Sequence, residues 1–292
     1  MLVHIKNIAK EAKKSGYAVG AFNIHNIESV LGIARAAVRA NSPVIIQVSE
    51  STIEYMGIKP ITHLVSTVAK NIAISVPVAL HLDHGKSLNS ISECIKSGFS
   101  SVHIDASELP LDENIALTKS IVAFAHDRGV WVQGEVGSII GEHGRISGKT
   151  KKEIPLADPE EVIKFVSETK VDTIAAAIGT AHGVFSNEDI NFPLLRKIAA
   201  KVKIPFVLHG GSGIDDGRIK KAIKEGVVII NIGTDVKVAF SKTLINTCAK
   251  NKNETDPRKL LSPTIKAIEE TVYNKIKLFG GLDKAGSPKY KT

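Results

Sequence analysis

Three apolar, strand-like runs of this chain each end on a histidine that is followed at once by glycine. The three histidines are His84, His182 and His209. If the runs are strands of one sheet, the imidazoles lie together at one of its ends. Three neutral imidazoles that meet would bind a divalent metal and leave a coordination position open for substrate. The pattern therefore predicts a catalytic Zn²⁺ site rather than a closed structural one.

Asp83 precedes His84 directly, and neighbouring side chains of an ideal strand face opposite sides. At a strand end this geometry relaxes, so we assign His84 to the metal and Asp83 to proton transfer. The alternative for Asp83 is a cap on the next helix. His81, one pleat earlier, is interpreted as a core histidine.

Glycines surround the last histidine and recur after the next apolar run, in His209-Gly210-Gly211-Ser212-Gly213 and Asn231-Ile232-Gly233-Thr234. Glycine lets the backbone approach a ligand closely, and the first glycine segment precedes a predicted helix at residues 215–225, whose free N–H groups can bind an anion. In a barrel, these segments would follow strands seven and eight, where a phosphate site is frequent. We therefore expect a phosphate site there.

Short apolar runs alternate with longer segments of helical period along the whole chain. We predict strands at residues 19–23, 44–49, 78–83, 101–105, 130–135, 172–178, 205–209 and 227–231. Between them, helices are predicted at residues 27–40, 61–71, 88–97, 114–128, 159–169, 193–201 and 215–225. This alternation favours a parallel eight-stranded (β/α)8 TIM barrel, with a doubly wound open sheet as the alternative.

We predict that residues 1–292 form a single catalytic domain, because α/β barrels of this length have one core. A short helix at residues 4–14 precedes the barrel. A helical extension at residues 259–277 follows it and could cover the barrel or meet another subunit. In such barrels, catalytic residues lie at the carboxyl ends of the strands. Here the ends are mostly polar: Asn23, Ser49, Asp83 with His84, Asp105, Glu135, the turn to His182, His209 and Asn231.

Composition excludes several classes of protein. The formal charge is +8, but the basic residues are scattered and form no arginine-rich arm, which argues against nucleic acid as a partner. No apolar window is long enough to span a membrane, and the amino terminus lacks a secretory pattern, so we expect no membrane association and a cytoplasmic location. Cys94 and Cys248 are interpreted as isolated thiols.

Six motifs taken in order resemble the class II, zinc-dependent ketose-bisphosphate aldolases, of the fructose or tagatose type. They are Leu80-His81-Leu82-Asp83-His84-Gly85, Ile104-Asp105-Ala106-Ser107, Gly134-Glu135-Val136-Gly137, Ala177-Ile178-Gly179-Thr180-Ala181-His182-Gly183, Leu208-His209-Gly210-Gly211-Ser212-Gly213 and Asn231-Ile232-Gly233-Thr234. The resemblance extends over most of the chain. It implies glycolytic or related carbohydrate metabolism and a homodimer or homotetramer.

The resemblance also implies roles for individual residues. His84, His182 and His209 match the zinc ligands, and Asp105 and Glu135 match a second or alternative divalent-metal site. Asp83 matches the acid/base at the C4 hydroxyl. Polar substrate contacts and the dihydroxyacetone phosphate site are matched by Asn23, Ser49, Gly183, Gly210, Gly211, Ser212, Asn231, Gly233 and Thr234. A monovalent cation, Na⁺ or K⁺, often lies near that phosphate in the family.

The implied reaction is reversible cleavage of a ketose 1,6-bisphosphate to dihydroxyacetone phosphate and glyceraldehyde 3-phosphate through a zinc-bound enediolate. The metal would act as a Lewis acid on the developing oxyanion. The alternative class of aldolase needs a lysine nucleophile inside the barrel. None of the eight predicted strands ends in lysine.

The chain departs from the family pattern in several places. A mobile-loop glutamate of the family exchanges the C3 proton; here His143 falls at that position, and either His143 or, after a one-residue shift, Glu142 is the base. Glu108 and Ser138 replace a usual histidine and arginine. Ile265 and Lys266 stand where an arginine often binds the far phosphate of a neighbouring subunit. Two alternatives therefore stay open: an aldolase that joins dihydroxyacetone phosphate to a different aldehyde, and a non-catalytic aldolase-like subunit.

Overall fold

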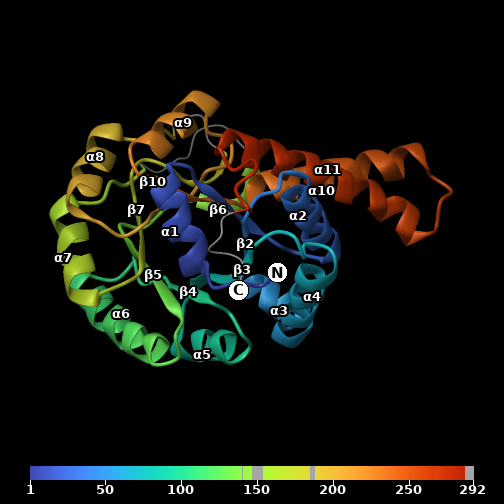
Figure 1. The fold of residues 1–292 in the computed structure, drawn as a ribbon. Coiled ribbons are helices and arrows are strands. Elements are labelled where there is room, and N and C mark those ends of the chain that lie inside the picture. Colours follow the sequence, from blue (N-terminus) through green and yellow to red (C-terminus); the bar gives the residue numbers. More distant parts are fainter. Residues whose placement is uncertain (140, 147–153, 185–187, 287–292) are drawn as a thin grey trace.

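The computed structural model describes residues 1–139, 141–146, 154–184 and 188–286, with the backbone alone for 141–146 and 184. Within these residues, eight parallel strands close into a barrel (Figure 1), which confirms the predicted (β/α)8 fold over the open sheet. Around the barrel their order is β1 (Val19–Asn23), β10 (Val227–Ile232), β9 (Phe206–Leu208), β7 (Thr173–Ala176), β5 (Trp131–Val136), β4 (Ser101–Ile104), β3 (Val78–Gly85) and β2 (Val44–Ser49).

Helices surround the barrel in the positions that the periodicity predicts, with bounds that differ by a few residues. They are α2 (Ile27–Arg39), α4 (Ile58–Asn71), α5 (Leu88–Lys96), α6 (Leu111–His126), α7 (Pro159–Thr169), α8 (Phe192–Lys201) and α9 (Asp216–Lys224). The signals at their ends act as expected. Asp158 accepts from the backbone N–H of Glu160 at the start of α7, and Gly129, with φ of 68°, follows α6.

The predicted amino-terminal helix, α1 (Ile5–Ser15), lies across the amino end of the barrel (Figure 1). One face of α1 carries Ile5, Ile8, Ala9 and Ala12, all buried. This face packs against inward-facing apolar side chains at the strand starts, among them Val19, Ile45, Ala79, Val207 and Ile229. The amino half of the barrel interior is therefore mostly an apolar core, with the buried hydroxyls of Ser101 and Thr173 at two strand starts, and the carboxylates of the site lie in the carboxyl half.

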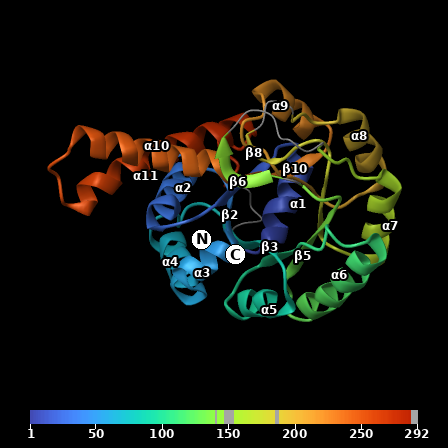
Figure 2. The ribbon, with the colours of Figure 1, turned by 180° about the vertical axis from the view of Figure 1, so that it is seen from behind.

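Several elements were not predicted from the sequence. A short helix, α3 (Glu50–Met56), directly follows β2, and a long helix, α10 (Thr234–Lys250), directly follows β10. With α11 (Pro257–Leu278), which contains the predicted extension, α10 forms a helical hairpin that projects from the barrel (Figures 1 and 2). Two further strands, β6 (Gly141–Ile146) and β8 (His182–Val184), pair outside the barrel in parallel. β8 carries His182, which the sequence placed only in a turn.

Candidate metal centre and active site

The polar side chains at the carboxyl end follow from the two-residue period of the strands. Inward positions on β1 run from Val19 through Ala21 to Asn23, and on β10 from Ile229 to Asn231. The same period brings Gln47, Asp83, His103, Gln133 and Glu135 inward above the apolar core, all at 3% exposure or less. One period thus builds both the core and the polar wall above it.

His84 breaks this alternation, which would turn it outward beside Asp83. Its φ is 51°, in the left-handed region, and the pairing of β3 with β4 shifts register between Leu82 and Gly85. A register shift with a left-handed residue is the geometry of a β-bulge, which re-aims a side chain. The bulge therefore lets Asp83 and His84 face the same site, although they are adjacent in the chain.

Asp105 fixes the orientation of the His84 ring. Asp105 Oδ2 lies 2.6 Å from His84 Nδ1, and this leaves Nε2 facing Asp83, 3.8 Å from its Oδ1. A carboxylate on the second nitrogen is the usual partner of a metal-binding histidine. Burial alone would lower the pKa of His84, but the charges of Asp83, Asp105 and Glu135 outweigh it and raise the pKa to about 9. The site therefore favours positive charge at this position.

The three histidine rings come together from separate strands. The ring centroid of His84 lies 4.9 Å from that of His182 and 4.9 Å from that of His209, and the last two are 5.7 Å apart. Ligating atoms of His84 and His209 lie within 4.8 Å of atoms of Asp83 and His103. The structure thus brings the three rings together, with carboxylates next to them, but the two groups of possible ligand atoms among the described residues include His84 and His209 and not His182.

Two amides orient His209. Its Nε2 lies 2.8 Å from Gln133 Nε2 and 3.2 Å from Asn231 Nδ2, while its Nδ1 lies 3.8 Å from Glu135 Oε2. Amide nitrogen and oxygen are assigned from the hydrogen-bond network, and two donors crowd the single lone pair of Nε2. Turning the Gln133 amide would let its oxygen accept from Nε2–H. The lone pair of Nδ1 would then face the histidine cluster.

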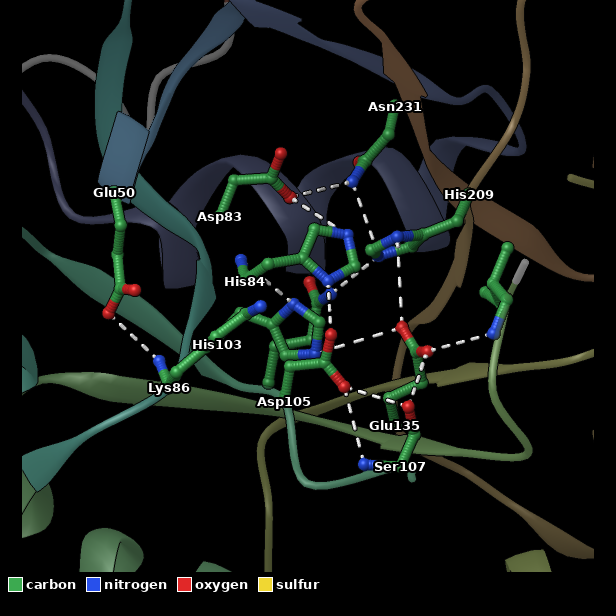
Figure 3. A network of polar contacts seen from close by, with 12 residues as sticks. Glu50, Asp83, His84, Lys86, His103, Asp105, Ser107, Glu135, His209 and Asn231 are labelled. Atoms are coloured by element: carbon green, nitrogen blue, oxygen red, sulfur yellow. Dashed lines mark hydrogen bonds and ion pairs between the residues drawn. The ribbon is translucent and has the colours of Figure 1, made fainter. Parts of the chain in front are cut away.

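Asp83 lies among amide groups on one side of the rings (Figure 3). Asn23 Nδ2 donates to Asp83 Oδ2 at 2.8 Å, and Asn231 Nδ2 lies 3.5 Å from Oδ1. Gln47 Nε2 in turn donates to Asn23 Oδ1 at 2.7 Å. The carboxylate is 1% exposed and is held by side chains rather than by the start of a helix. This surrounding fits an acid/base better than the capping role.

Asp105, Ser107 and Glu135 lie on the opposite side of the rings (Figure 3). Ser107 Oγ donates to Asp105 Oδ1 at 2.7 Å and lies 3.0 Å from Glu135 Oε1. Burial, followed by the charge of Asp105, raises the pKa of Glu135 to about 8. For Asp105, hydrogen bonds from His84 and Ser107 outweigh the upward effect of burial, so its pKa is well below the usual value. Together with His84 and His103, these carboxylates form a second group that could bind a metal ion.

His103, which the sequence did not single out, lies between the two sides. Its Nδ1 accepts from the backbone N–H of His84 at 3.3 Å, and its Nε2 lies 3.8 Å from Glu135 Oε2. Burial, with the positive charge of His84 next, lowers the pKa of His103 to about 3. The ring is therefore neutral at physiological pH. His81 is also buried, with Nδ1 3.0 Å from Ser101 Oγ, as expected of a core histidine.

The expected phosphate residues line one small cavity beside the histidines, together with Asn23 and Asp83. Its lining includes Gly183, Gly210, Ser212, Asn231, Gly233 and Thr234. Gly210 has φ of 66°, and a Cβ there would lie 2.2 Å from the carbonyl oxygen of Ala181, so only glycine fits. The predicted Gly211 instead donates its N–H to the carbonyl of Asn231 and is absent from this lining.

The helix that faces this cavity differs from the expected one. Asp215 accepts from the N–H groups of Gly217 and Arg218 and so caps α9, which the sequence offered as the anion-binding helix. The start of α10, at Gly233 and Thr234, has no side-chain cap and lines the cavity. Uncapped N–H groups at a helix start attract anions. A phosphate in this cavity would therefore meet the start of α10 rather than that of α9.

The remaining predicted residues lie at or beyond the rim. Ser49 Oγ lies 2.9 Å from Ser51 Oγ at the end of β2. Glu142 and His143 belong to β6, of which only the backbone is described, so the choice between them as base stays a prediction.

The residues present fit a divalent metal. Imidazole nitrogens suit zinc and similar ions, one ring has a carboxylate on its second nitrogen, and the raised pKa of His84 indicates a negative local potential. Sequence reasoning missed Gln47, His103, Ser107, Gln133 and Thr180, whose hydroxyl donates to the carbonyl of His209 at 2.8 Å. Counting back in twos from Asp105, Glu135 and Ser49 along their strands would have identified His103, Gln133 and Gln47.

Comparisons with known proteins agree over nearly the whole chain. Residues 3–284 match the family model described as fructose-bisphosphate aldolase class-II. Fructose-bisphosphate aldolases of Staphylococcus epidermidis and Geobacillus stearothermophilus are 40% and 41% identical over 286 residues, covering 97% of this chain and 99% of theirs. The crystal structure of the YdjI aldolase from Escherichia coli K12 superposes with a TM-score of 0.83 at 33% identity, covering 98% of this chain and all of that one.

Proposed function

Since the chain belongs to the class-II fructose-bisphosphate aldolase family, we propose that it cleaves a ketose 1,6-bisphosphate of the fructose or tagatose series. The family makes it an enzyme, a lyase acting on ketose bisphosphates. The proposed products are dihydroxyacetone phosphate and glyceraldehyde 3-phosphate, and the reaction is reversible. The observation that carries the proposal is the position of Asp83, buried beside three converging histidines and next to a glycine-lined cavity.

His84, His182 and His209 are the proposed ligands of the catalytic ion, with zinc the expected metal. When bound, this ion supplies positive charge that stabilises an oxyanion of the substrate. Asp105 and Glu135, joined through Ser107 Oγ, are the proposed carboxylates of a second divalent position. A monovalent cation near the phosphate cradle remains part of the proposal.

In the cleavage direction, Asp83 accepts the proton of the C4 hydroxyl group. The O–H electron pair forms the C4 carbonyl, the C3–C4 bond breaks, and its electron pair enters the C2 carbonyl as an enediolate. Asn23 donates to Asp83 Oδ2 and Asn231 Nδ2 lies 3.5 Å from Oδ1, so the two amides orient the carboxylate that receives the proton. The enediolate is then protonated at C3 by a residue of the loop after β5, for which Glu142 and His143 are the candidates.

The C1 phosphate is proposed to lie in the cradle formed by Gly183, Gly210, Ser212, Gly233 and Thr234. Asn231 lines the same cavity, and its Nδ2 lies 3.5 Å from Asp83 Oδ1. It can therefore contact both the phosphate-bearing end of the ketose and the carbons that react. Holding the phosphate at this end fixes the ketose relative to Asp83, and such positioning is a large part of catalysis.

We also propose a cytoplasmic homodimer or homotetramer. None of the described helices is long and apolar enough to cross a membrane. The α10–α11 hairpin projects from the barrel (Figure 1) and exposes Ile245 at 66%, which supports a subunit contact there.

A coupled assay with fructose and tagatose 1,6-bisphosphates, each with and without a chelator, tests the proposed function. Chelator-sensitive cleavage of one of them is expected, restored by added zinc. Cleavage that a chelator leaves intact would contradict the scheme. Turnover only with dihydroxyacetone phosphate and another aldehyde would favour the altered-aldehyde alternative, which the departures at Ile265 and Lys266 motivate. Absence of both metal binding and turnover would favour a non-catalytic subunit.

A further inference from the structure

Two cavities at the carboxyl end of the barrel share Ser51, and the second of them also borders His84 and His182. The first, of about 640 Å³, lies between the start of α2, α3 and the first turns of α10, and we name it the α10 cavity. The second, of about 540 Å³, lies over the ends of β3, β4 and β5, and we name it the acidic cavity. Either is large enough for the three-carbon aldehyde half of a ketose, so the question is which one receives its phosphate.

The two cavities differ in charge. Among the described residues that line the α10 cavity, Lys237 and Lys242 are cationic and none is a carboxylate. The acidic cavity has one lysine, Lys86, against the carboxylates of Glu50, Glu54, Asp105 and Glu108, and it also contains Glu135, whose pKa is raised to about 8. A phosphate dianion is attracted by the first set of charges and repelled by the second. Charge therefore favours the α10 cavity.

The position of Asp83 favours the same cavity. Asp83 and Asn231 lie on one side of the imidazole rings, and Asp105 and Glu135 lie on the other (Figure 3). Asp83 accepts a hydrogen bond from Asn23 on β1. Because Asp83 is proposed to meet the C4 hydroxyl group, carbons C5 and C6 of the substrate must extend from the same side. The strands on that side, β1 and β10, lead directly into the segments that line the α10 cavity.

Lys237 is the cation nearest to this path, one turn into α10. It is half-buried, and burial lowers the pKa of its ammonium group, an effect that the field of Asp83 partly offsets. No carboxylate in the described part of the chain lies within ion-pair distance of it. Asp235, also on α10, pairs instead with Lys275 on α11. A partly desolvated ammonium without a carboxylate gains most from an anionic ligand.

We propose that Lys237 binds the far phosphate of the substrate, the one carried by the aldehyde half, within the α10 cavity. The proposal rests on the proposed function, since it presumes a ketose phosphorylated at both ends. In this chain Ile265 and Lys266 stand where an arginine often binds the far phosphate. The proposal assigns the positive charge for that phosphate to Lys237 on α10 of the same chain. Lys237 is then a specificity-determining residue, and the C1 phosphate stays in the glycine cradle.

Binding of two unreactive ligands tests the proposal without turnover. A hexitol 1,6-bisphosphate and the matching hexitol 1-phosphate are titrated calorimetrically into the metal-loaded wild-type protein and into Lys237→Met, Lys86→Met and Lys250→Met. Lys86 lines the acidic cavity, and Lys250 is exposed at the far end of α10. The ratio of the two affinities measures the far phosphate alone.

Lys237→Met is expected to reduce the preference for the bisphosphate about 10- to 100-fold, the range for a charged hydrogen bond, and to leave monophosphate affinity unchanged. Lys250→Met and Lys86→Met should retain the wild-type ratio. An unchanged ratio in Lys237→Met, or a loss in Lys86→Met instead, overturns the proposal. A wild-type protein that prefers the bisphosphate through Lys237 but cleaves no ketose refutes the proposed function and leaves this assignment standing.

Discussion

Replacing Asp83 by asparagine should separate the two halves of the reaction. The substitution keeps the shape of a side chain that is 1% exposed, so the fold and the histidine cluster should be retained. Asn23 Nδ2 donates to the present Oδ2 at 2.8 Å. The new amide would therefore turn its oxygen toward Asn23 and its NH₂ group toward the substrate, where a proton acceptor is needed. The base is removed, and a donor takes its place.

General acid–base catalysis contributes about 10²- to 10⁴-fold, so kcat for cleavage of the ketose bisphosphate should fall by that factor in Asp83→Asn. Exchange of the C3 proton of dihydroxyacetone phosphate uses a different residue and should stay within about threefold of wild type. The assays are coupled cleavage and tritium or deuterium exchange, with metal content measured on the same preparations. Equal losses in cleavage and exchange, at full metal content, would refute the assignment of Asp83 to the C4 hydroxyl alone.

Three other perturbations follow from the geometry of the site. Asp105→Asn removes the carboxylate 2.6 Å from His84 Nδ1 and should weaken zinc affinity about 10- to 100-fold in chelator competition, whereas wild-type affinity would show that the contact is dispensable. Gly210→Ala places a Cβ 2.2 Å from a backbone carbonyl oxygen and should lower the free energy of unfolding measured in urea. The matched control is Gly98→Ala, whose Cβ meets nothing within 4 Å. The control should cost only the backbone strain of about 1–2 kcal/mol, so the loss in Gly210→Ala should be larger. In the metal-free protein, the raised pKa values of His84, about 9, and Glu135, about 8, mean that bound protons stabilise the fold. Below about pH 6.5 the lowered pKa values of His81 and His103 act in the opposite direction, so the fall in stability is expected as pH rises from about 7 to 9. Zinc affinity should rise over the same range, and a flat profile there would contradict both raised pKa values.

The barrel was predictable because its strands repeat one simple pattern. Apolar residues that face the core on both sides of a strand give continuous runs, and all eight predicted runs lie in the closed sheet. α10 was missed because its exposed residues, such as Lys242 and Asn246, give it no strong apolar stripe, and because its apolar contacts are with α11. β6 and β8 pair only with each other, so neither carries a core pattern.

The meeting of the three histidine rings was predictable from their residue type and their places at strand ends. The inward turn of His84 was expected from the looser geometry of a strand end, but the bulge that produces it is visible only in the pairing of β3 with β4. Gln47 and Gln133 have no chemistry of their own and become recognisable only from the residues they orient. Lys237 resembles every other surface lysine in the sequence, and only the fold brings it within the electrostatic field of Asp83.

The seal that α1 forms over the amino end of the barrel divides the molecule into two parts that can change independently. The apolar contacts between α1 and the strand starts stabilise the fold, while the histidines and carboxylates are positioned by the strand ends and the short segments after them. Substitutions at the exposed positions of α3 and α10 are therefore expected to alter which aldehyde is accepted without loosening the core. Descendants of this chain can thus acquire new substrates while they keep the same bond-breaking step.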